Sequence, residues 1–142
     1  MNNLLIDILL IDAHPRDSQA ALETLRALHP APTVALLDNG HEALRFLKQF
    51  PPHENAPRPR LIVFDWDLPH GREALADIAS QDRLKCIPLI VWTASSSPQD
   101  VLCAYEHFAN SYIPKPGNPE EFSAVLHGLV SFWLSTAQLP EP

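Results

Sequence analysis

Residues 61–69 read LIVFDWDLP, an apolar run that passes directly into acids, and this segment constrains the fold more than any other in the chain. A strand buried on both faces of a parallel sheet has this continuous apolar pattern, and its carboxyl end meets solvent at Asp65. Three further apolar runs pass into a polar residue in the same way, at Asp12, Thr93 and Lys115. Ligands collect at this edge of open α/β sheets. The four strand ends therefore predict one rim with two acids, a hydroxyl and an ammonium, which suits a divalent cation and a phosphoryl group.

The composition of the 142 residues narrows the class of protein. This length favours one domain with a full core, and a formal charge of -7 without clustered Lys or Arg argues against a nucleic-acid surface. Cys86 and Cys103 lack CxxC spacing and are expected to be reduced thiols, which favours the cytoplasm. Asp7 and Asp12 interrupt the N-terminal apolar stretch, and no apolar run reaches membrane-spanning length. We therefore expect neither a signal peptide nor a membrane partner.

Segments with helical periodicity alternate with the apolar runs along the chain. Ala21, Leu25 and Leu28 share one helical face, for example. The proline-rich stretch 51–59 suggests a surface loop. We expect strands at 8–11, 33–37, 61–64, 89–92 and 111–114, and helices at 17–28, 41–50, 72–79, 99–109 and 119–136. Five repeated βα units imply an α/β fold with a doubly wound, five-stranded parallel sheet. The expected domain covers residues 1–142, with a core at about 6–136, a short C-terminal tail and no residues left for an output domain.

The ordered residues at the rim resemble the active site of response-regulator receiver domains, whose fold is the flavodoxin-like or CheY-like (βα)5 arrangement. The matching residues are Asp12, Asp65, Thr93, the aromatic Tyr112 and the Lys115–Pro116 pair. Each motif alone is weak, but the ordered set, with the right element between each pair, is specific. The resemblance covers nearly the whole chain. Residues 109–112 and the aromatic pair Phe132 and Trp133 look most like the single-domain regulators that serve phytochrome-type histidine kinases.

The resemblance implies a two-component, phosphorelay function for a signalling protein that is not an enzyme. Asp65 would accept a phosphoryl group from a sensor histidine kinase, with Mg²⁺ neutralising the charge in transit. Asp12, Asp65 and the backbone carbonyl of Asp67 would hold the metal. Lys115 would form an ion pair with Asp65 and afterwards with its phosphoryl group.

The resemblance also implies a switch and an interface. Thr93 would hydrogen-bond a phosphoryl oxygen and draw its loop inward, which frees space for Tyr112 to rotate. Tyr112, Phe132 and Trp133 would lie near the face through which receivers signal, and we expect a homodimer or a docked kinase there. Phe132 and Trp133 could equally cap the protein's own core or form part of a docking surface, because adjacent helical residues cannot both face one core.

Two departures from the family pattern bear on the chemistry. Ala13 stands where receivers carry a second acid, so Mg²⁺ is expected to bind weakly unless the side chain of Asp67 compensates, and a solvated Asp67 is the simpler expectation. Only His70 separates Pro69 from Gly71, which shortens the loop after the phosphoacceptor strand. One alternative function is therefore a pseudo-receiver, an interaction module with impaired Mg²⁺-dependent phosphorylation. A Mg²⁺-dependent phosphohydrolase has less support, because its second acid would have to be Asp67.

Three other features have two interpretations each. His14, beside the acids, could ligate the cation, but a hydrogen-bonded loop histidine is the expectation. Cys103 and His107 share one helix face, yet two ligands make no closed metal site, so their placement is taken as incidental. Trp66 could gate access to Asp65 or pack half-buried at the sheet edge.

Overall fold

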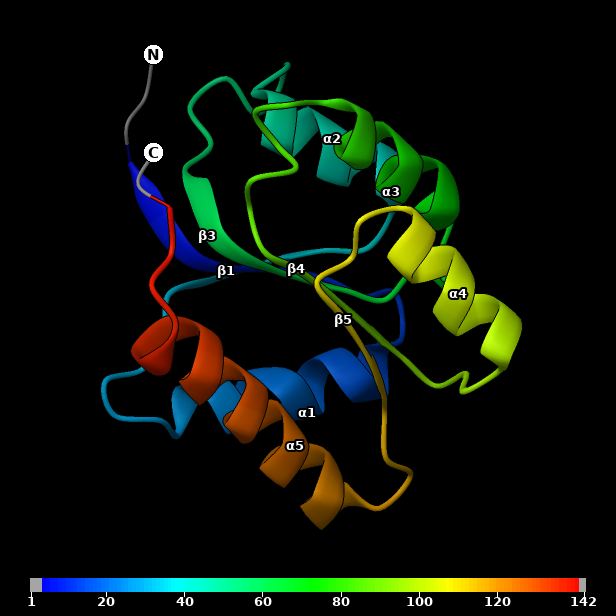
Figure 1. Ribbon diagram of the computed structural model, residues 1–142. Helices are drawn as coiled ribbons and strands as arrows, with labels where there is room; N and C mark the ends of the chain where they lie inside the picture. The colour runs from blue at the N-terminus through cyan, green and yellow to red at the C-terminus, as the bar shows by residue number, and fades with distance from the viewer. Residues whose placement is uncertain (1–3, 141–142) are drawn as a thin grey trace.

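The computed structural model describes residues 4–140 as a five-stranded parallel sheet with helices on both faces (Figure 1). The strand order is β2-β1-β3-β4-β5, which places β3 in the centre. The strands are β1 (Leu5–Ile11), β2 (Val34–Leu37), β3 (Arg58–Phe64), β4 (Leu89–Thr93) and β5 (Ser111–Pro114). The helices are α1 (Pro15–Arg26), α2 (Gly40–Lys48), α3 (Gly71–Ser80), α4 (Pro98–Glu106), α5 (Pro119–Ser131) and the π-helical turn η1 (Phe132–Thr136). The predicted doubly wound α/β fold is confirmed.

Successive side chains of the buried strands point to opposite faces of the sheet, so the core has two layers. In β1, Ile8 and Leu10 pack with residues of α1 and α5, whereas Leu9 and Ile11 pack with residues of α2, α3 and α4. These two groups of helices lie on opposite sides of the sheet in Figure 1. Because both faces of the sheet are covered, polar side chains that follow the central strands reach solvent at the strand ends. The fold therefore concentrates those side chains at one edge.

The central strand starts earlier than predicted. β3 begins at Arg58, so the end of the predicted loop at 51–59 is strand instead. Arg58 pairs with Leu5 of β1 and extends the ladder toward its amino end. On the other side of β3, the pairing with β4 begins only at Ile62. Within the described sheet, position 59 therefore has no strand partner on the β4 side. Pro59 has no N–H to donate, but no hydrogen bond of the sheet is lost, so proline is tolerated there.

Three helices end earlier than predicted: α1 at Arg26, before residue 28, α2 at Lys48, before residue 50, and α4. α4 ends at Glu106, before the predicted residue 109, and Phe108 has a φ of 64°, in the left-handed region that interrupts a helix. α5 continues through η1 to Thr136, so the predicted last helix at 119–136 is confirmed. None of the helices within residues 4–140 combines the length and apolarity that crossing a bilayer requires.

Two glycines bring α2 and α3 against the loop that follows β3. The Gly40 N–H donates to the Pro69 carbonyl at 2.8 Å, and a Cβ at position 40 would overlap the His70 carbonyl oxygen. A Cβ at Gly71 would likewise overlap the Trp66 carbonyl oxygen. The loop after Asp65 is therefore held by backbone contacts that only glycine permits.

Candidate functional site

Asp12, Asp65 and Lys115 converge at the carboxyl ends of β1, β3 and β5. The Lys115 Nζ atom lies 2.8 Å from Asp12 Oδ2 and 2.7 Å from Asp65 Oδ2. Asp12 is 2% exposed and Asp65 1% exposed, and the Lys115 side chain is 4% exposed. These charges are withdrawn from water, so they interact more strongly than surface charges at the same distances.

Asp17 is a further member of this cluster that the strand-end argument missed. Its Oδ2 atom lies 2.9 Å from Lys115 Nζ and comes from the first turn of α1. Three carboxylates therefore surround one ammonium, which leaves a net charge of about −2 when all four groups are ionised. The signal in the sequence was the position of Asp17, because α1 begins shortly after the end of β1 and an acid in its first turn stays at the same rim.

Burial and this imbalance set the ionisation of the cluster. Burial raises the pKa of Asp12 above its ordinary 3.8, and the hydrogen bonds from Lys115 and from the His14 N–H reduce the rise without cancelling it. Burial alone would lower the pKa of Lys115, but its hydrogen bonds to Asp12 and Asp65 outweigh that effect and raise the pKa above 10.5. Lys115 is therefore charged at neutral pH, and a further cation would relieve the cost of ionising Asp12.

His14 and Asp67 flank the mouth of the cluster. The His14 Nε2 atom lies 3.5 Å from Asp65 Oδ2 and 3.5 Å from Asp67 Oδ2. The His14 N–H donates to Asp12 Oδ1 at 2.8 Å, and the Asp67 N–H donates to Asp65 Oδ1 at 2.9 Å. The Asp67 side chain is 78% exposed and the His14 side chain 42% exposed. Both side chains therefore stand between the buried acids and solvent.

The donor atoms at this mouth suit a divalent cation. One ligand atom from each of Asp12, His14 and Asp65 lies within 4.8 Å of the others. Carboxylate oxygens are the ligands that Mg²⁺ takes, and the surplus negative charge is what such an ion would neutralise. Ala13 offers only a methyl group at this rim. The residues present therefore fit a bound divalent cation, with fewer carboxylates than an adjacent acid pair would supply.

A pocket of about 540 Å³ lies beside the acids and is lined in part by Thr93, Trp66 and Asp67. Trp66 is only 3% exposed, so it is buried more deeply than either expectation for it implied. Its ring meets the Tyr112 ring edge-on at 6.1 Å, and the Tyr112 hydroxyl donates to the Ser95 carbonyl at 2.7 Å. Tyr112 is therefore turned inward, beneath the loop that follows β4.

Arg72 connects this pocket to α4, and the sequence alone did not point to it. Its guanidinium lies 3.9 Å from the centre of the Trp66 ring and 2.9 Å from Asp100 Oδ1. Asp100 Oδ2 accepts a hydrogen bond from the Ser95 hydroxyl at 2.6 Å. The Ser95 and Arg72 hydrogen bonds hold the pKa of Asp100 below 3.8. One polar network thus joins α3, α4 and the loop after β4. The sequence did not predict it, because nothing in the sequence indicates that a single Arg and a distant Asp form a pair.

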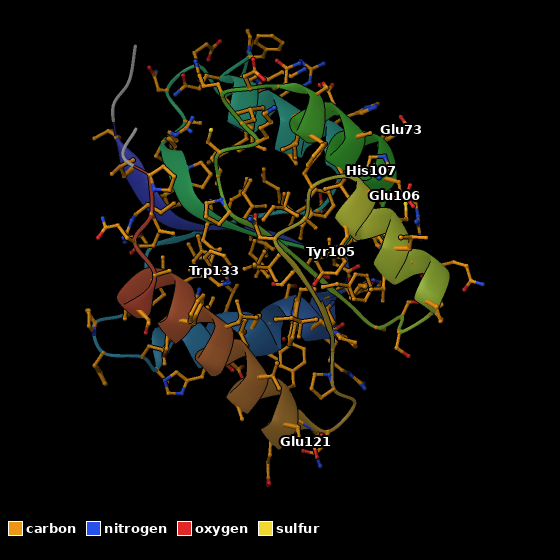
Figure 2. All side chains as sticks on the ribbon, in the orientation of Figure 1. Glu73, Tyr105, Glu106, His107, Glu121 and Trp133 are labelled. Carbon is orange, nitrogen blue, oxygen red and sulfur yellow. The ribbon has the colours of Figure 1, made fainter. Side chains whose placement is uncertain are left out.

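The aromatic residues expected at an interface do not lie together. Tyr112 is buried, whereas Phe132 is 50% exposed beyond the end of α5. Trp133 packs partly against the core between the sheet and α1 and α5, and its ring meets Phe132 edge-on at 5.2 Å. Figure 2 shows Trp133 at the end of the C-terminal helix and Tyr105 on α4. Exposed apolar side chains that no motif in the sequence marked recur every three residues on α4 and just after it: Leu102, Tyr105 and Phe108.

The chain is similar to known regulators over most of its length. Residues 8–127 match the response regulator receiver domain. Response regulator Rcp1 of Synechocystis sp. is 38% identical over 135 residues, which cover 94% of this chain and 92% of Rcp1. The structure of the phosphorylated cyanobacterial phytochrome response regulator RcpA matches with a TM-score of 0.91 and 36% identity, over 95% of this chain and 98% of that one. The Mn²⁺-bound form of Rcp1 matches with a TM-score of 0.89 and 38% identity, over 95% of this chain and 99% of that one.

The sheet order, the acidic rim with its lysine and these similarities define one class of protein: the chain belongs to the response-regulator receiver family. Receivers of two-component systems accept a phosphoryl group on an aspartate from a sensor histidine kinase, and they generally signal through protein contacts. They bind a divalent cation at an acidic pocket of this kind. The family and the general function expected from the sequence are confirmed.

Proposed function

We propose that Asp65 accepts a phosphoryl group from a phosphohistidine of a sensor kinase, and that the protein acts through contacts with other proteins and not as a metabolic enzyme. The observation that carries the proposal is the buried Asp65 carboxylate at the end of the central strand, 2.7 Å from Lys115 Nζ. A compact ammonium at this distance can balance the charge that a phosphoryl group brings to the carboxylate.

Each residue of the site has its own role in the phosphoryl transfer. An oxygen of Asp65 attacks phosphorus, the P–N bond of the phosphohistidine breaks, and an acyl phosphate forms as the imidazole leaves with the electron pair of that bond. Lys115 exchanges its Asp65 oxygen for a phosphoryl oxygen. Thr93, buried at the end of β4, donates its hydroxyl to another phosphoryl oxygen.

Mg²⁺ is the cation we assign to this transfer, held by Asp12, Asp65 and the backbone carbonyl of Asp67, where it would neutralise charge on the phosphoryl oxygens. Support comes from the surplus of carboxylates around Lys115. Because Ala13 supplies no ligand, Ala13→Asp should bind Mg²⁺ roughly tenfold more tightly in calorimetric titration. Ala31→Asp, at an exposed position away from the rim, is the matched control. Equal Mg²⁺ affinity in Ala13→Asp and the unaltered protein would show that the site is already complete.

The signal would leave the site through the loop after β4. Movement of Thr93 toward a phosphoryl oxygen would draw the following residues with it, including the Ser95 carbonyl that accepts the Tyr112 hydroxyl. The Ser95 hydroxyl bond to Asp100 would be disturbed in the same step. Tyr112 is then free to rotate, and the exposed side of α4 shifts with its loop.

The partner kinase is inferred to be of the phytochrome type, and the protein to work in the cytoplasm as a homodimer. Similarity to RcpA, a phytochrome response regulator, supports the kinase type. The free thiols Cys86 and Cys103 suit a reducing compartment. The exposed Phe132 ring, packed on Trp133, supports self-association at the end of α5.

Phosphoramidate with Mg²⁺ tests the phosphorylation directly. We expect intact mass spectrometry to show one added phosphoryl group that is stable in acid and lost in base, as for an acyl phosphate. Asp65→Asn should abolish the adduct, and Asp82→Asn, whose native side chain is 96% exposed, should retain it. Absence of the adduct at saturating donor and metal would instead support the pseudo-receiver, which the methyl group of Ala13 favours.

A further inference from the structure

His14 lies beside the buried acids of the cation site, to which Ala13 supplies no carboxylate. Its Nε2 atom lies 3.5 Å from Asp65 Oδ2. With a carboxylate oxygen of Asp12, these ligand atoms all lie within 4.8 Å of one another. Two buried carboxylates and one imidazole therefore border the same small volume at the ends of β1 and β3.

The distances suit coordination of a transition ion. Ligands bound to Zn²⁺ at about 2.0–2.1 Å lie roughly 3.3 Å apart in a tetrahedral site. The 3.5 Å between the His14 nitrogen and the Asp65 oxygen therefore needs only a small closing movement. The His14 side chain is 42% exposed and makes no capping hydrogen bond to α1 within the described residues, so neither burial nor a helix cap opposes this movement.

The backbone keeps the imidazole beside the acids. The His14 N–H donates to Asp12 Oδ1 at 2.8 Å, and Pro15 begins α1 directly after it. Lys115 bonds to Asp12 Oδ2 and Asp65 Oδ2, yet a carboxylate oxygen that accepts one hydrogen bond retains a lone pair for a metal. Coordination by His14 is thus compatible with the ion pairs of Lys115.

We propose that His14, together with Asp12 and Asp65, is a metal ligand of this site, and that it makes the site prefer Zn²⁺ over Mg²⁺. Imidazole nitrogen suits Zn²⁺, whereas Mg²⁺ takes oxygen ligands and keeps much of its water. The methyl group of Ala13 weakens Mg²⁺ binding, and His14 strengthens Zn²⁺ binding, so both residues shift the preference in the same direction. The inference rests on the proposed function, because it concerns the cation that the phosphorylation site selects.

The test compares Zn²⁺ and Mg²⁺ binding by isothermal titration calorimetry in protein with and without His14. Every protein in the series carries His41→Gln, because His41, His70 and Glu73 form the other group in residues 4–140 that could hold a metal. We expect a single Zn²⁺ site whose dissociation constant rises at least about tenfold in both His14→Ala and His14→Gln, since each loses the imidazole nitrogen. The dissociation constant for Mg²⁺ should change less than about twofold.

The absorption spectrum of bound Co²⁺ gives a second readout that does not depend on phosphorylation. Visible bands of Co²⁺ shift when a nitrogen ligand is replaced by oxygen, so the spectrum of the protein with His14 should differ from that of His14→Gln. Asp12→Asn should weaken Zn²⁺ binding as well, because it removes a charged ligand. Identical Zn²⁺ affinities and Co²⁺ spectra with and without His14 would overturn the proposal.

Phosphoramidate labelling in the same series separates this inference from the proposed function. If Asp65 is labelled in the presence of Mg²⁺ and the Zn²⁺ affinity is the same with and without His14, the ligand role of His14 is rejected and the phosphorylation of Asp65 is supported. Zn²⁺ affinity that depends on His14, without labelling in either metal, would support the ligand role and reject phosphorylation of Asp65.

Discussion

Lys115 is the residue on which the stability of the rim depends most. Lys115→Met leaves Asp12, Asp17 and Asp65 facing one another without a cation, and breaking a buried ion pair from one side costs about 3–5 kcal/mol. Lys48→Met is the control, since Lys48 pairs with Asp77 at 3.1 Å nearer the surface and should cost less than about 1 kcal/mol. Urea denaturation measures the loss of unfolding free energy in Lys115→Met and in Lys48→Met. Equal losses in the two variants would contradict a special dependence of the buried cluster on its lysine.

The contribution of Lys115 to the free energy of unfolding should fall as the pH becomes strongly alkaline. The pKa of Lys115 is raised above 10.5 in the folded protein, because its hydrogen bonds to Asp12 and Asp65 outweigh the effect of burial. The stability it provides is therefore fully present below pH 10.5 and is lost as the pH rises through the folded value. The difference in unfolding free energy between the unaltered protein and Lys115→Met should narrow over that alkaline range.

Asp12 should have the opposite effect on stability. Burial raises its pKa above 3.8, so the folded protein holds this carboxylate ionised at a cost when the pH is neutral. Asp12→Asn keeps an oxygen for the His14 N–H and should raise the unfolding free energy by about 1 kcal/mol near neutral pH. The gain should be absent below pH 3.8 and develop as the pH rises through the folded pKa. Urea denaturation across this range would refute the prediction if the two proteins had the same stability throughout.

At the residue scale, the sequence predicted well which residues follow the strand ends, but it predicted poorly in which direction the side chains point. Convergence of Asp12, Asp65 and Lys115 follows from parallel strands, because their carboxyl ends share one edge. Asp17 and His14 reach the same cluster from the start of α1 and the loop before it. Their approach depends on rotamers and on the angle at which the helix leaves the strand, and a periodic pattern specifies neither.

At the scale of elements, the contact between α2 and the loop after β3 should be intolerant of any side chain. Gly40→Ala would drive its Cβ into the His70 carbonyl oxygen, and the required backbone shift should cost about 2 kcal/mol or more of unfolding free energy. The Cβ of Gly128→Ala, within α5, would meet no described atom within 4 Å beyond its chain neighbours and the helix's own backbone, and the variant should instead stabilise by about 0.5–1 kcal/mol through helix propensity. Thermal or urea unfolding of the two variants checks the opposite signs.

Element types were readable from the sequence, whereas several boundaries were set by tertiary context. The prolines and polar residues at 51–59 have the composition of a loop, yet Arg58 and Pro59 join β3 because β1 extends far enough to pair with them. α4 stops before Phe108, a residue type that gives no sign in the sequence of adopting a φ of 64°. The periodicity of α1, by contrast, correctly predicts the face that packs on the sheet, because Ala21 and Leu25 are buried there and Leu28 packs against them.

At the scale of the whole molecule, Phe132 and Trp133 should separate association from folding. Phe132→Ser removes a ring that is 50% exposed, so it should raise the dissociation constant of the proposed homodimer at least about tenfold in analytical ultracentrifugation, with stability nearly unchanged. Phe50→Ser, at a ring that is 54% exposed elsewhere on the surface, is the matched control and should leave association intact.

Trp133→Ala should behave differently, because Trp133 packs partly against the core. We expect it to lower the unfolding free energy by roughly 2 kcal/mol. A Phe132→Ser variant that associates as tightly as the Phe50→Ser control would place the interface elsewhere, and the exposed side of α4 would be the next surface to test.

The three ion pairs of Lys115 span 103, 98 and 50 residues of sequence, to Asp12, Asp17 and Asp65 respectively. Contacts that close such long loops form late in the folding of parallel sheets. During synthesis the acids leave the ribosome well before the lysine, so a growing or half-folded chain presents carboxylates without their ammonium. Such a chain lacks the geometry needed to receive a phosphoryl group. Under the proposed function, the fraction of molecules that can be labelled on Asp65 should therefore count the molecules that have finished folding, and immature copies should stay silent in the signalling pathway.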